Sequence, residues 1–206
     1  MTGLRERKKR RTHEAISEAA IALFLEHGFD QVSITQVAEA AEVSRRTLFA
    51  YFPAKEDLVV HRFADHETEP ARVIRARPPG TAPIEALRDN FLDGLRRRDP
   101  ITGLNDIPEI LALSGMILRT PALVARMTRF QQGAERALAE ALQETAGTPA
   151  LAARVAATQV VAVEWLLALD NARRLTEGQT ADDRFEKATE EAEQAFALLT
   201  EGLAGI

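Results

Sequence analysis

The sequence has 206 residues, of which 46% are hydrophobic and 28% are charged. This length and composition predict a folded chain with a substantial core and exclude an intrinsically disordered protein. The absence of cysteine excludes disulfides, cysteine-ligated zinc and thiol nucleophiles. No apolar run reaches the ~18 residues of a membrane span, and the basic N-terminus lacks the apolar stretch of a secretory signal. We therefore expect a cytoplasmic protein with no membrane partner.

Charge is distributed unevenly along the chain. The formal net charge is −5, but residues 1–62 carry a net charge of +1 and the remainder carries −6. The segment LRERKKRR, Leu4 to Arg11, holds six cations and one acid. A solvated tail can have this composition, but a basic end on an acidic body also suggests a polyanionic partner.

Helical patterns follow one another along the chain. Apolar residues recur at spacings of three and four, and no stretch alternates as a strand would. We therefore predict an all-α fold with about nine helices. The first helix is expected to run from about Thr12, an N-cap candidate, to Gly28, which can adopt the left-handed conformation that ends a helix. Phe29 is expected to close over that end.

Two short helices are predicted next. SITQ, Ser33 to Gln36, has the pattern of a capping box, in which the serine accepts an amide hydrogen bond and the glutamine reaches back. Glu42 to Ser44 then forms a tight connection to a helix capped by Ser44. Two short helices joined in this way have helix-turn-helix geometry, although such turns more often contain glycine.

Two adjacent arginines stand at the start of this third helix. Helical spacing turns Leu48 and Phe52 toward the core and leaves Arg45 and Arg46 in the first turn. Cations at a helix N-terminus oppose the helix dipole and cost roughly a few tenths of a kcal/mol each, so we expect an external anion to compensate. Guanidinium groups fit phosphates and the guanine edge, and the N-terminal end of a recognition helix enters the major groove.

The series from Ile16 to Leu58 resembles the DNA-binding domain of the TetR family of bacterial transcriptional regulators. The motifs that carry the resemblance are Gly28-Phe29, Ser33-Ile34, Val43-Ser44, Tyr51-Phe52 and Lys55-Glu56. The resemblance implies a three-helix DNA-binding domain over residues 1–58 and a larger helical effector-binding and dimerisation domain over residues 59–206. It also implies a repressor that a small-molecule effector releases from a palindromic operator in double-stranded DNA.

The resemblance assigns DNA contacts to individual side chains. Five residues of the third helix would meet bases or phosphates: Arg45, Arg46, Thr47, Phe49 and Tyr51. Ser33 and Thr35 would touch the DNA backbone, and Lys55 would hold a phosphate at the start of a fourth helix that ends near Glu67. The family often has a small residue at Arg46 and a tyrosine at Phe49. The missing hydroxyl leaves Phe49 an apolar contact only.

The last two helices are predicted to form a homodimer. Val160 to Leu169 is apolar nearly all round, and the segment after Thr180 carries one apolar stripe on an acidic rod. Two such helices can meet the same pair of a second copy in a four-helix bundle, or both can be buried within one subunit. The resemblance favours the dimer. The predicted interface residues are Ala162, Leu166, Leu169, Ala192, Phe196 and Leu199.

Large side chains are scattered between these two ends. They can fill a core or, as the resemblance implies, surround an unidentified small-molecule effector. The candidate pocket residues are Phe91, Met116, Met127, Phe130, Gln131 and Trp165. Four further polar side chains lie near apolar helix faces and could also line such a pocket: Asn90, Arg119, Glu164 and Asn171.

The sequence does not predict an enzyme. The densest histidine cluster contains His61, Asp65, His66 and Glu67, but His66 lies off the helical face that His61 and Asp65 share, which favours a solvated surface over a metal site. No glycine-rich phosphate loop or G-x-S-x-G turn is present. We expect no catalytic residue, no metal and no cofactor. The alternative function is a helical interaction protein without ligand-controlled DNA release.

Overall fold

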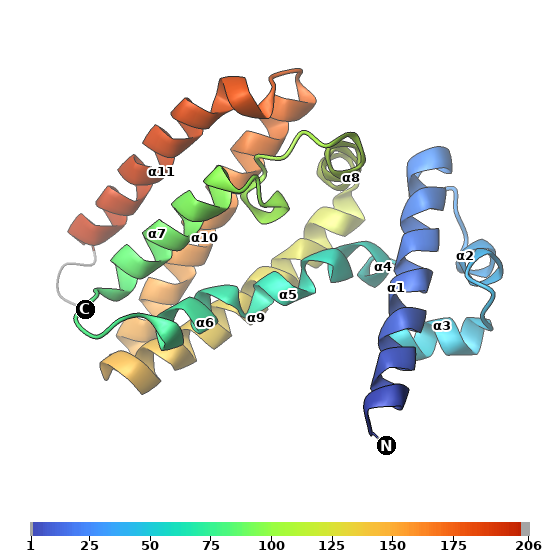
Figure 1. Cartoon of the computed structure of the whole chain (residues 1–206), viewed down its shortest axis with the longest axis horizontal. Helices are drawn as coiled ribbons and strands as arrows, with labels where there is room; N and C mark the ends of the chain where they lie inside the picture. The colour runs from blue at the N-terminus through green and yellow to red at the C-terminus, as the bar shows by residue number, and fades with distance from the viewer. Residues whose placement is uncertain (1, 203–206) are drawn as a thin grey trace. The chain divides into compact units, whose positions relative to one another are not determined.

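The computed structural model describes residues 2–202, and all regular structure in this range is helical (Figure 1). Nine α-helices in the described range have seven residues or more, and none of its residues forms a strand. The predicted all-α fold is therefore confirmed. The chain divides into two compact units. The first contains the residues up to Arg62 together with Met116–Met127, and the second contains Phe63–Gly115 and the residues from Thr128 onward.

The first unit contains the helix-turn-helix. Its helices are α1 (Thr2–His27), α2 (Ile34–Ala40), α3 (Arg45–Tyr51) and α4 (Asp57–Val60). The helix α1 begins at Thr2 and not near Thr12, so the predicted start was wrong. The basic segment before Thr12 is rich in lysine and arginine, which are good helix formers, and the helix continues through it.

Local capping defines the ends of these helices as predicted. Gly28 follows α1 with φ 89°, and its N–H donates to the carbonyl of Phe24 at 2.9 Å. Phe29 is buried, with its ring centroid 4.9 Å from that of Phe24. Ser33 and Gln36 form the capping box at the start of α2. These contacts fix where each helix begins or ends before any long-range packing is considered.

The turn between α2 and α3 uses a glutamate where glycine is common. Glu42 has φ 54°, in the left-handed region, and the N–H of Val43 donates to the carbonyl of Ala38 at 2.9 Å. Ser44 then caps α3, because its hydroxyl accepts the N–H of Thr47 at 3.0 Å. The absence of glycine from this turn therefore does not prevent the helix-turn-helix geometry.

The fourth helix is shorter than the predicted segment from Lys55 to Glu67. After α4 the chain forms a 3₁₀ turn, η1 (His61–Phe63), and then α5 (Ala64–Glu67). Leu58 in α4 is buried, and its carbonyl accepts the hydroxyl proton of Ser17 in α1 at 2.9 Å. The tighter 3₁₀ turn rotates the residues that follow relative to α-helical register.

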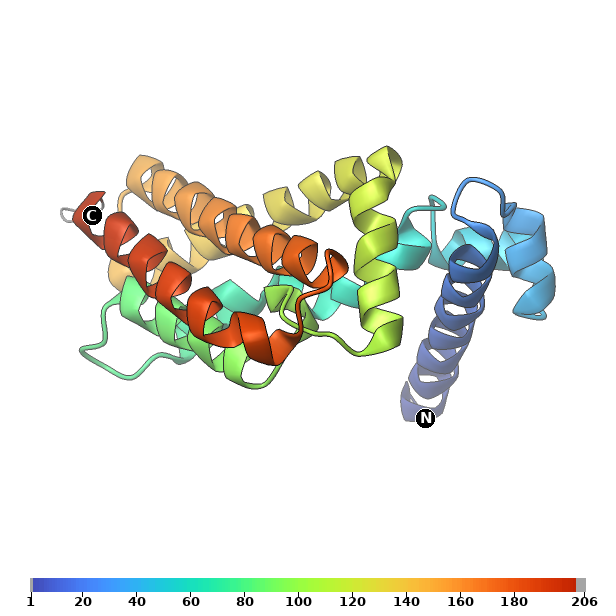
Figure 2. The same cartoon turned by 90° about the horizontal axis from the view of Figure 1, so that it is seen from above.

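The second unit is a helical bundle. After α5 its helices are α6 (Glu69–Ala76), α7 (Pro83–Arg96), η2 (Pro100–Thr102), α8 (Pro108–Arg119), α9 (Pro121–Ala146), α10 (Ala150–Thr176) and α11 (Ala181–Gly202). The last residues of α8 and the first residues of α9 belong to the first unit. The helices α7, α10 and α11 lie lengthwise beside one another (Figures 1 and 2). The helices α7 and α9 begin at Pro83 and Pro121, and α10 begins directly after Pro149.

A buried polar network ties η2 to α10. The side chain of Asn171 donates to the carbonyl of Thr102 at 3.0 Å and accepts from Arg184, which is only 6% exposed. Gly103 follows η2 with φ 71°, and a Cβ at this position would lie 1.9 Å from the carbonyl oxygen of Ala168. Glycine is therefore required for η2 to approach α10 this closely.

Candidate DNA interface and effector pocket

The start of α3 presents two free cations. Arg45 and Arg46 are exposed, and within residues 2–202 neither guanidinium has a hydrogen bond or an ion pair with another side chain. The first turn of α3 contains no acidic residue that would offset them. Two uncompensated cations at a helix N-terminus favour an anion from outside the chain.

The rest of α3 divides into a buried side and an outer side. Leu48 and Phe52 are buried, as predicted, and Phe49 is 43% exposed. Thr47 is half-buried, and its hydroxyl lies 2.8 Å from that of the cap residue, whereas the half-buried Tyr51 has its ring centroid 5.9 Å from that of His13. Arginines and an exposed aromatic ring therefore share the outer side with a partly engaged threonine.

The start of α2 offers two exposed hydroxyl groups. Ser33 uses its hydroxyl within the capping box, where it lies 2.8 Å from the side-chain oxygen of Gln36. Thr35 is exposed in the first turn of α2. Both positions therefore remain accessible to a ligand at the helix-turn-helix.

Lys55 does not occupy the predicted position of a free phosphate-binding cation. Its ammonium group donates to the carbonyl of Phe29 and lies 4.4 Å from the centroid of the Phe29 ring. Partial burial lowers the pKa of Lys55 below its usual value. The side chain closes the end of α1 instead of projecting outward, so Lys55 is not available as a free phosphate-binding cation.

The basic segment forms the first turns of α1. Lys8, Lys9, Arg10 and Arg11 are all exposed. One turn further on, the ring centroid of His13 lies 4.3 Å from that of Phe52, the residue that ends α3. The cations therefore extend along α1 beyond the point where this helix packs against the end of the recognition helix.

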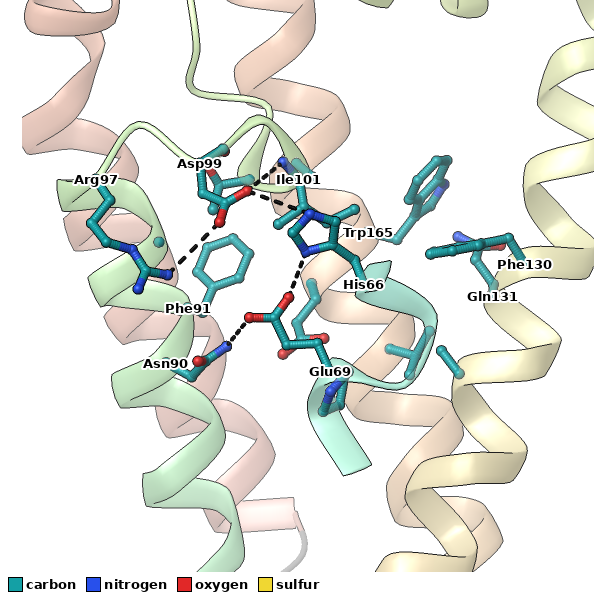
Figure 3. A pocket seen from close by; sticks show the side chains of 17 residues that line it. His66, Glu69, Asn90, Phe91, Arg97, Asp99, Ile101, Phe130, Gln131 and Trp165 are labelled. Atoms are coloured by element: carbon teal, nitrogen blue, oxygen red, sulfur yellow. Dashed lines mark hydrogen bonds and ion pairs between the residues drawn. The ribbon is translucent and has the colours of Figure 1, made fainter. Parts of the chain in front are cut away.

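A pocket lies inside the second unit (Figure 3). Its cavity volume is about 80 Å³. The wider space between the surrounding protein atoms is about 680 Å³ and is partly open to solvent. Side chains from α5, α6, α7, α9, α10 and the segment around η2 line it. Its apolar lining is Pro70, Phe91, Ile101, Phe130, Ala134, Val161, Trp165 and Ala168.

One wall of the pocket carries a hydrogen-bonded polar cluster (Figure 3). His66 Nδ1 lies 2.6 Å from Glu69 Oε2, and Asn90 donates to the other oxygen of Glu69 at 3.5 Å. The hydrogen bond to Glu69 raises the pKa of His66, and the same bond lowers the pKa of Glu69. His66 Nε2 also lies 3.9 Å from Asp99. The His66 imidazole therefore lies between two carboxylates, and both favour its protonated form.

Glu164 contributes a different carboxyl group to the pocket. Its surface is partly accessible because it lines the cavity, but protein atoms surround the group. Burial raises the pKa of Glu164 to about 8, and repulsion from Glu69 adds to this rise. Near neutral pH this carboxyl is therefore largely protonated.

The structure brings some of the predicted pocket residues together and separates others. Phe91, Phe130, Gln131 and Trp165 line the pocket. Met116 and Met127 do not; they are buried in the first unit. Sequence reasoning missed His66, Glu69, Asp99 and Thr102 as lining residues. The spacing of His66 and Glu69, three residues apart, was the available indication of a hydrogen-bonded pair.

The histidine-rich segment does not form a metal site. His66 bonds to Glu69 and not to the acids that neighbour it in sequence. Across the described residues, no three histidine or carboxylate side chains gather closely enough to hold a metal ion.

Half of the predicted dimer residues belong to the core of the subunit. Ala192, Phe196 and Leu199 are buried in the second unit, where the Phe196 ring centroid lies 6.1 Å from that of Phe91. Their assignment to an intersubunit surface was therefore wrong, because the apolar stripe of α11 faces α7 and α10. On α10, Ala162 and Leu166 are exposed and Leu169 is half-buried. The exposed large apolar residues of the two helices are Leu151, Val155, Leu166 and Leu198.

The helix-turn-helix and the separate helical unit define a class of DNA-binding protein. A family model described as bacterial regulatory proteins of the tetR family matches residues 16–61. The transcriptional regulator TcmR of Streptomyces glaucescens is 31% identical over 178 residues, which cover 82% of this chain and 79% of TcmR. The transcriptional repressor KstR of Rhodococcus jostii is 30% identical over 165 residues, or 79% of this chain and 70% of KstR.

Solved structures extend the similarity over both units. The Thermus thermophilus repressor FadR, in complex with lauroyl-CoA, has a TM-score of 0.56 at 25% identity, covering 92% of this chain and 94% of FadR. NalD of Pseudomonas aeruginosa, at 20% identity and a TM-score of 0.58, shares the fold. The chain belongs to the TetR family of transcriptional regulators and is a DNA-binding regulator.

Proposed function

We propose that this regulator is a repressor that binds a palindromic operator as a homodimer and leaves it when a small effector occupies the pocket of the second unit. The observation that carries the DNA-binding part is the pair of exposed arginines, Arg45 and Arg46, at the start of α3. Two relatives, KstR and FadR, are named as repressors, and FadR was solved with a bound acyl-CoA. Proposed contacts at the DNA also include Ser33, Thr35 and Thr47, Phe49 and Tyr51.

Base readout is assigned to Arg45. After selection of bound fragments from genomic DNA, Arg45→Ala should weaken operator binding by ~1–3 kcal/mol and relax the choice of one base pair in each half-site. Arg129→Ala, a change of an exposed arginine on α9, is the matched control. Fluorescence anisotropy measures both variants on the operator and on single-base variants of it. An equal loss on every sequence would make Arg45 a phosphate contact and contradict the assignment.

Nonspecific affinity is assigned to the basic first turns of α1. Replacing Lys8, Lys9, Arg10 and Arg11 by glutamine should reduce the slope of log affinity against log salt concentration by ~0.9 for each phosphate that these cations neutralise. The preference for operator over unrelated duplex should remain. A loss of preference with Arg45 intact would show instead that this end of α1 reads a groove.

The dimer contact is assigned to the exposed apolar side of α10 and α11. Leu166 is 65% exposed and Leu198 is 63% exposed, and large apolar residues in this position on one subunit favour contact with a second copy. A two-fold symmetric protein also matches the symmetry of a palindromic operator. By length and composition alone α10 could cross a membrane, but core helices of soluble proteins meet the same criterion. We propose a cytoplasmic location.

Charge at this contact should separate the subunits. Leu166→Glu should give monomers in sedimentation experiments, because an unpaired charge would be buried in the contact. Glu186→Gln, on an exposed position of α11, is the control and should remain dimeric. An unchanged mass for Leu166→Glu would move the interface elsewhere on the protein.

Effector-controlled release has a thermodynamic requirement. An effector can weaken DNA binding only if it favours a state whose recognition helices do not match two major grooves ~34–36 Å apart. Because linkage is reciprocal, operator DNA must weaken effector binding by the same factor, typically about 5–150-fold. Calorimetry of an effector with and without operator tests this requirement. Equal effector affinities with and without operator would contradict effector-controlled release and would mean that no ligand controls binding to the operator.

A further inference from the structure

The ionisable side chains that line the pocket include more acidic groups than basic groups. Three carboxyl groups, those of Glu69, Asp99 and Glu164, face two cationic side chains, those of His66 and Arg97. An imbalance of this kind inside a cavity indicates which charge a ligand should carry, provided that the existing pairs can be identified.

Both cations already have carboxylate partners. His66 lies 2.6 Å from Glu69 and 3.9 Å from Asp99. Arg97 lies 3.0 Å from Asp93 and 3.7 Å from Asp99. Figure 3 shows His66 between the two acids and Arg97 directed at Asp99. Neither cation is therefore left over for an anionic ligand.

Glu164 is the carboxyl group without a partner. No hydrogen bond or ion pair joins it to any residue of the described chain, and the charge that acts on it is the like charge of Glu69. An unpaired ionised carboxylate in a protein interior is expensive, and burial raises the pKa of Glu164 to about 8, so the group avoids this cost by staying protonated. A carboxyl group with a structural role would have a hydrogen-bond or ion-pair partner, and Glu164 has neither among the described residues.

The neighbours of Glu164 suit a cation with an apolar body. The aromatic side chains Phe91, Phe130 and Trp165 line the same cavity, and aromatic faces attract cations as well as apolar groups. The cavity volume of about 80 Å³ is small for a ligand pocket, so only a small ligand would fit, with part of it in the space that is open to solvent.

We propose that this pocket binds an organic cation, a protonated amine on a small aromatic or apolar body, and that Glu164 holds its charge. The proposal rests on the assignment of this pocket as the effector site. A carboxylate ligand would meet an unpaired acid and no free cation. A neutral ligand that accepts a hydrogen bond would use the protonated form of Glu164, and its affinity would change with pH in the opposite direction.

Three probes of equal size and different charge test the proposal. Benzylammonium, benzyl alcohol and benzoate are titrated at pH 8 into the protein of 206 residues, with affinities from calorimetry. The protein has one tryptophan, Trp165, so its fluorescence reports occupancy of the pocket. Benzylammonium should bind at least about tenfold more tightly than the other two. Equal or tighter binding of the alcohol or the benzoate, or no response to any probe, would overturn the proposal.

The pH dependence and one isosteric variant provide independent checks. Benzylammonium stays charged between pH 6 and pH 8, whereas the ionised fraction of Glu164 should rise about 50-fold with its pKa near 8, so affinity should rise by a similar factor. Glu164→Gln should remove both this rise and the preference for the cation, while benzyl alcohol binds as before. Glu186→Gln should behave like the wild type. A preference for the cation that persists in Glu164→Gln would refute the role of Glu164.

Operator release is measured separately from binding. Benzylammonium that binds the pocket without weakening operator affinity would leave the cation site in place and contradict ligand-controlled release. A neutral or anionic compound that releases the operator through this pocket would support the regulator and overturn the cation site.

Discussion

Gly103 is the position at which one methyl group should have the largest predictable effect. In Gly103→Ala the added Cβ would lie 1.9 Å from the carbonyl oxygen of Ala168 and 2.8 Å from its carbonyl carbon. Cβ atoms do not approach backbone atoms this closely, so η2 must move away from α10. The movement weakens the hydrogen bond from Asn171 to Thr102, which is 3.0 Å long.

The expected loss has three separable parts. Alanine at φ 71° costs ~1–2 kcal/mol for the left-handed backbone. Overpacking against a rigid helix backbone costs a further ~1–3 kcal/mol, and a weakened buried hydrogen bond about 1 kcal/mol. Gly103→Ala should therefore lower the free energy of unfolding by ~3–6 kcal/mol.

Gly147 provides the matched control. It has φ 65°, and a Cβ there would meet no atom within 4 Å, so Gly147→Ala should incur the backbone part alone, ~1–2 kcal/mol. Urea unfolding followed by Trp165 fluorescence, at equal protein concentrations because the protein is proposed to dimerise, measures both variants. Losses within about 0.5 kcal/mol of each other would show that η2 yields freely and would refute the reasoning.

Three further predictions concern residues whose surroundings the structure defines. Phe196→Ala should lower the free energy of unfolding by ~3–5 kcal/mol in urea titrations while sedimentation still shows a dimer, because the ring is buried within the subunit; a stable monomer would return Phe196 to the interface. Lys55→Met should lower the free energy of unfolding by about 1 kcal/mol through loss of the hydrogen bond to Phe29. In anisotropy titrations it should leave unchanged the slope of log operator affinity against log salt concentration. A slope reduced by ~0.9 would show that Lys55 contacts a phosphate. His66→Ala should destabilise the protein most below pH 6.5, because the raised pKa of His66 gives stability that is lost as the pH rises through the pKa of the folded state. The stability contributed by Glu69, whose pKa is lowered, should fade as the pH drops below 4.5. Thermal unfolding at pH 5, 6 and 9 measures the effect of His66→Ala, and a loss of stability that grows with pH would contradict the pairing of His66 with Glu69.

The helix-turn-helix could be predicted in detail because its determinants are local. Ser33 with Gln36, Ser44 with Thr47, and Gly28 act through contacts between residues no more than four apart in sequence. A capping residue satisfies backbone groups of its own helix, so its identity and position are enough to place a helix end. The exposed Arg45 and Arg46 follow from the same register.

The orientation of single side chains could not be predicted in the same way. Leu198 and Leu199 are neighbours in sequence, yet Leu198 is exposed and Leu199 is buried. The spacing of apolar residues predicted the apolar stripe of α11. The spacing is the same whether the stripe faces its own bundle or a second subunit, so the sequence could not distinguish the two. The packing of α7 and α10 against α11 decided this. Lys55 likewise turned inward because the carbonyl of Phe29, distant in sequence, lies within reach of its ammonium group.

The pocket is the feature that only the tertiary structure determined. His66, Asp99 and Glu164 come from three separate segments, and no periodicity within any one segment indicates that they face the same cavity. The sequence by itself determined the all-α fold, the DNA-binding unit and its family, since these depend on helical spacing and on capping within a few residues. Which carboxyl group is paired and which is left alone depends on distances across the bundle. The unpaired state of Glu164, and the ligand charge that we infer from it, therefore became apparent only when the helices were assembled.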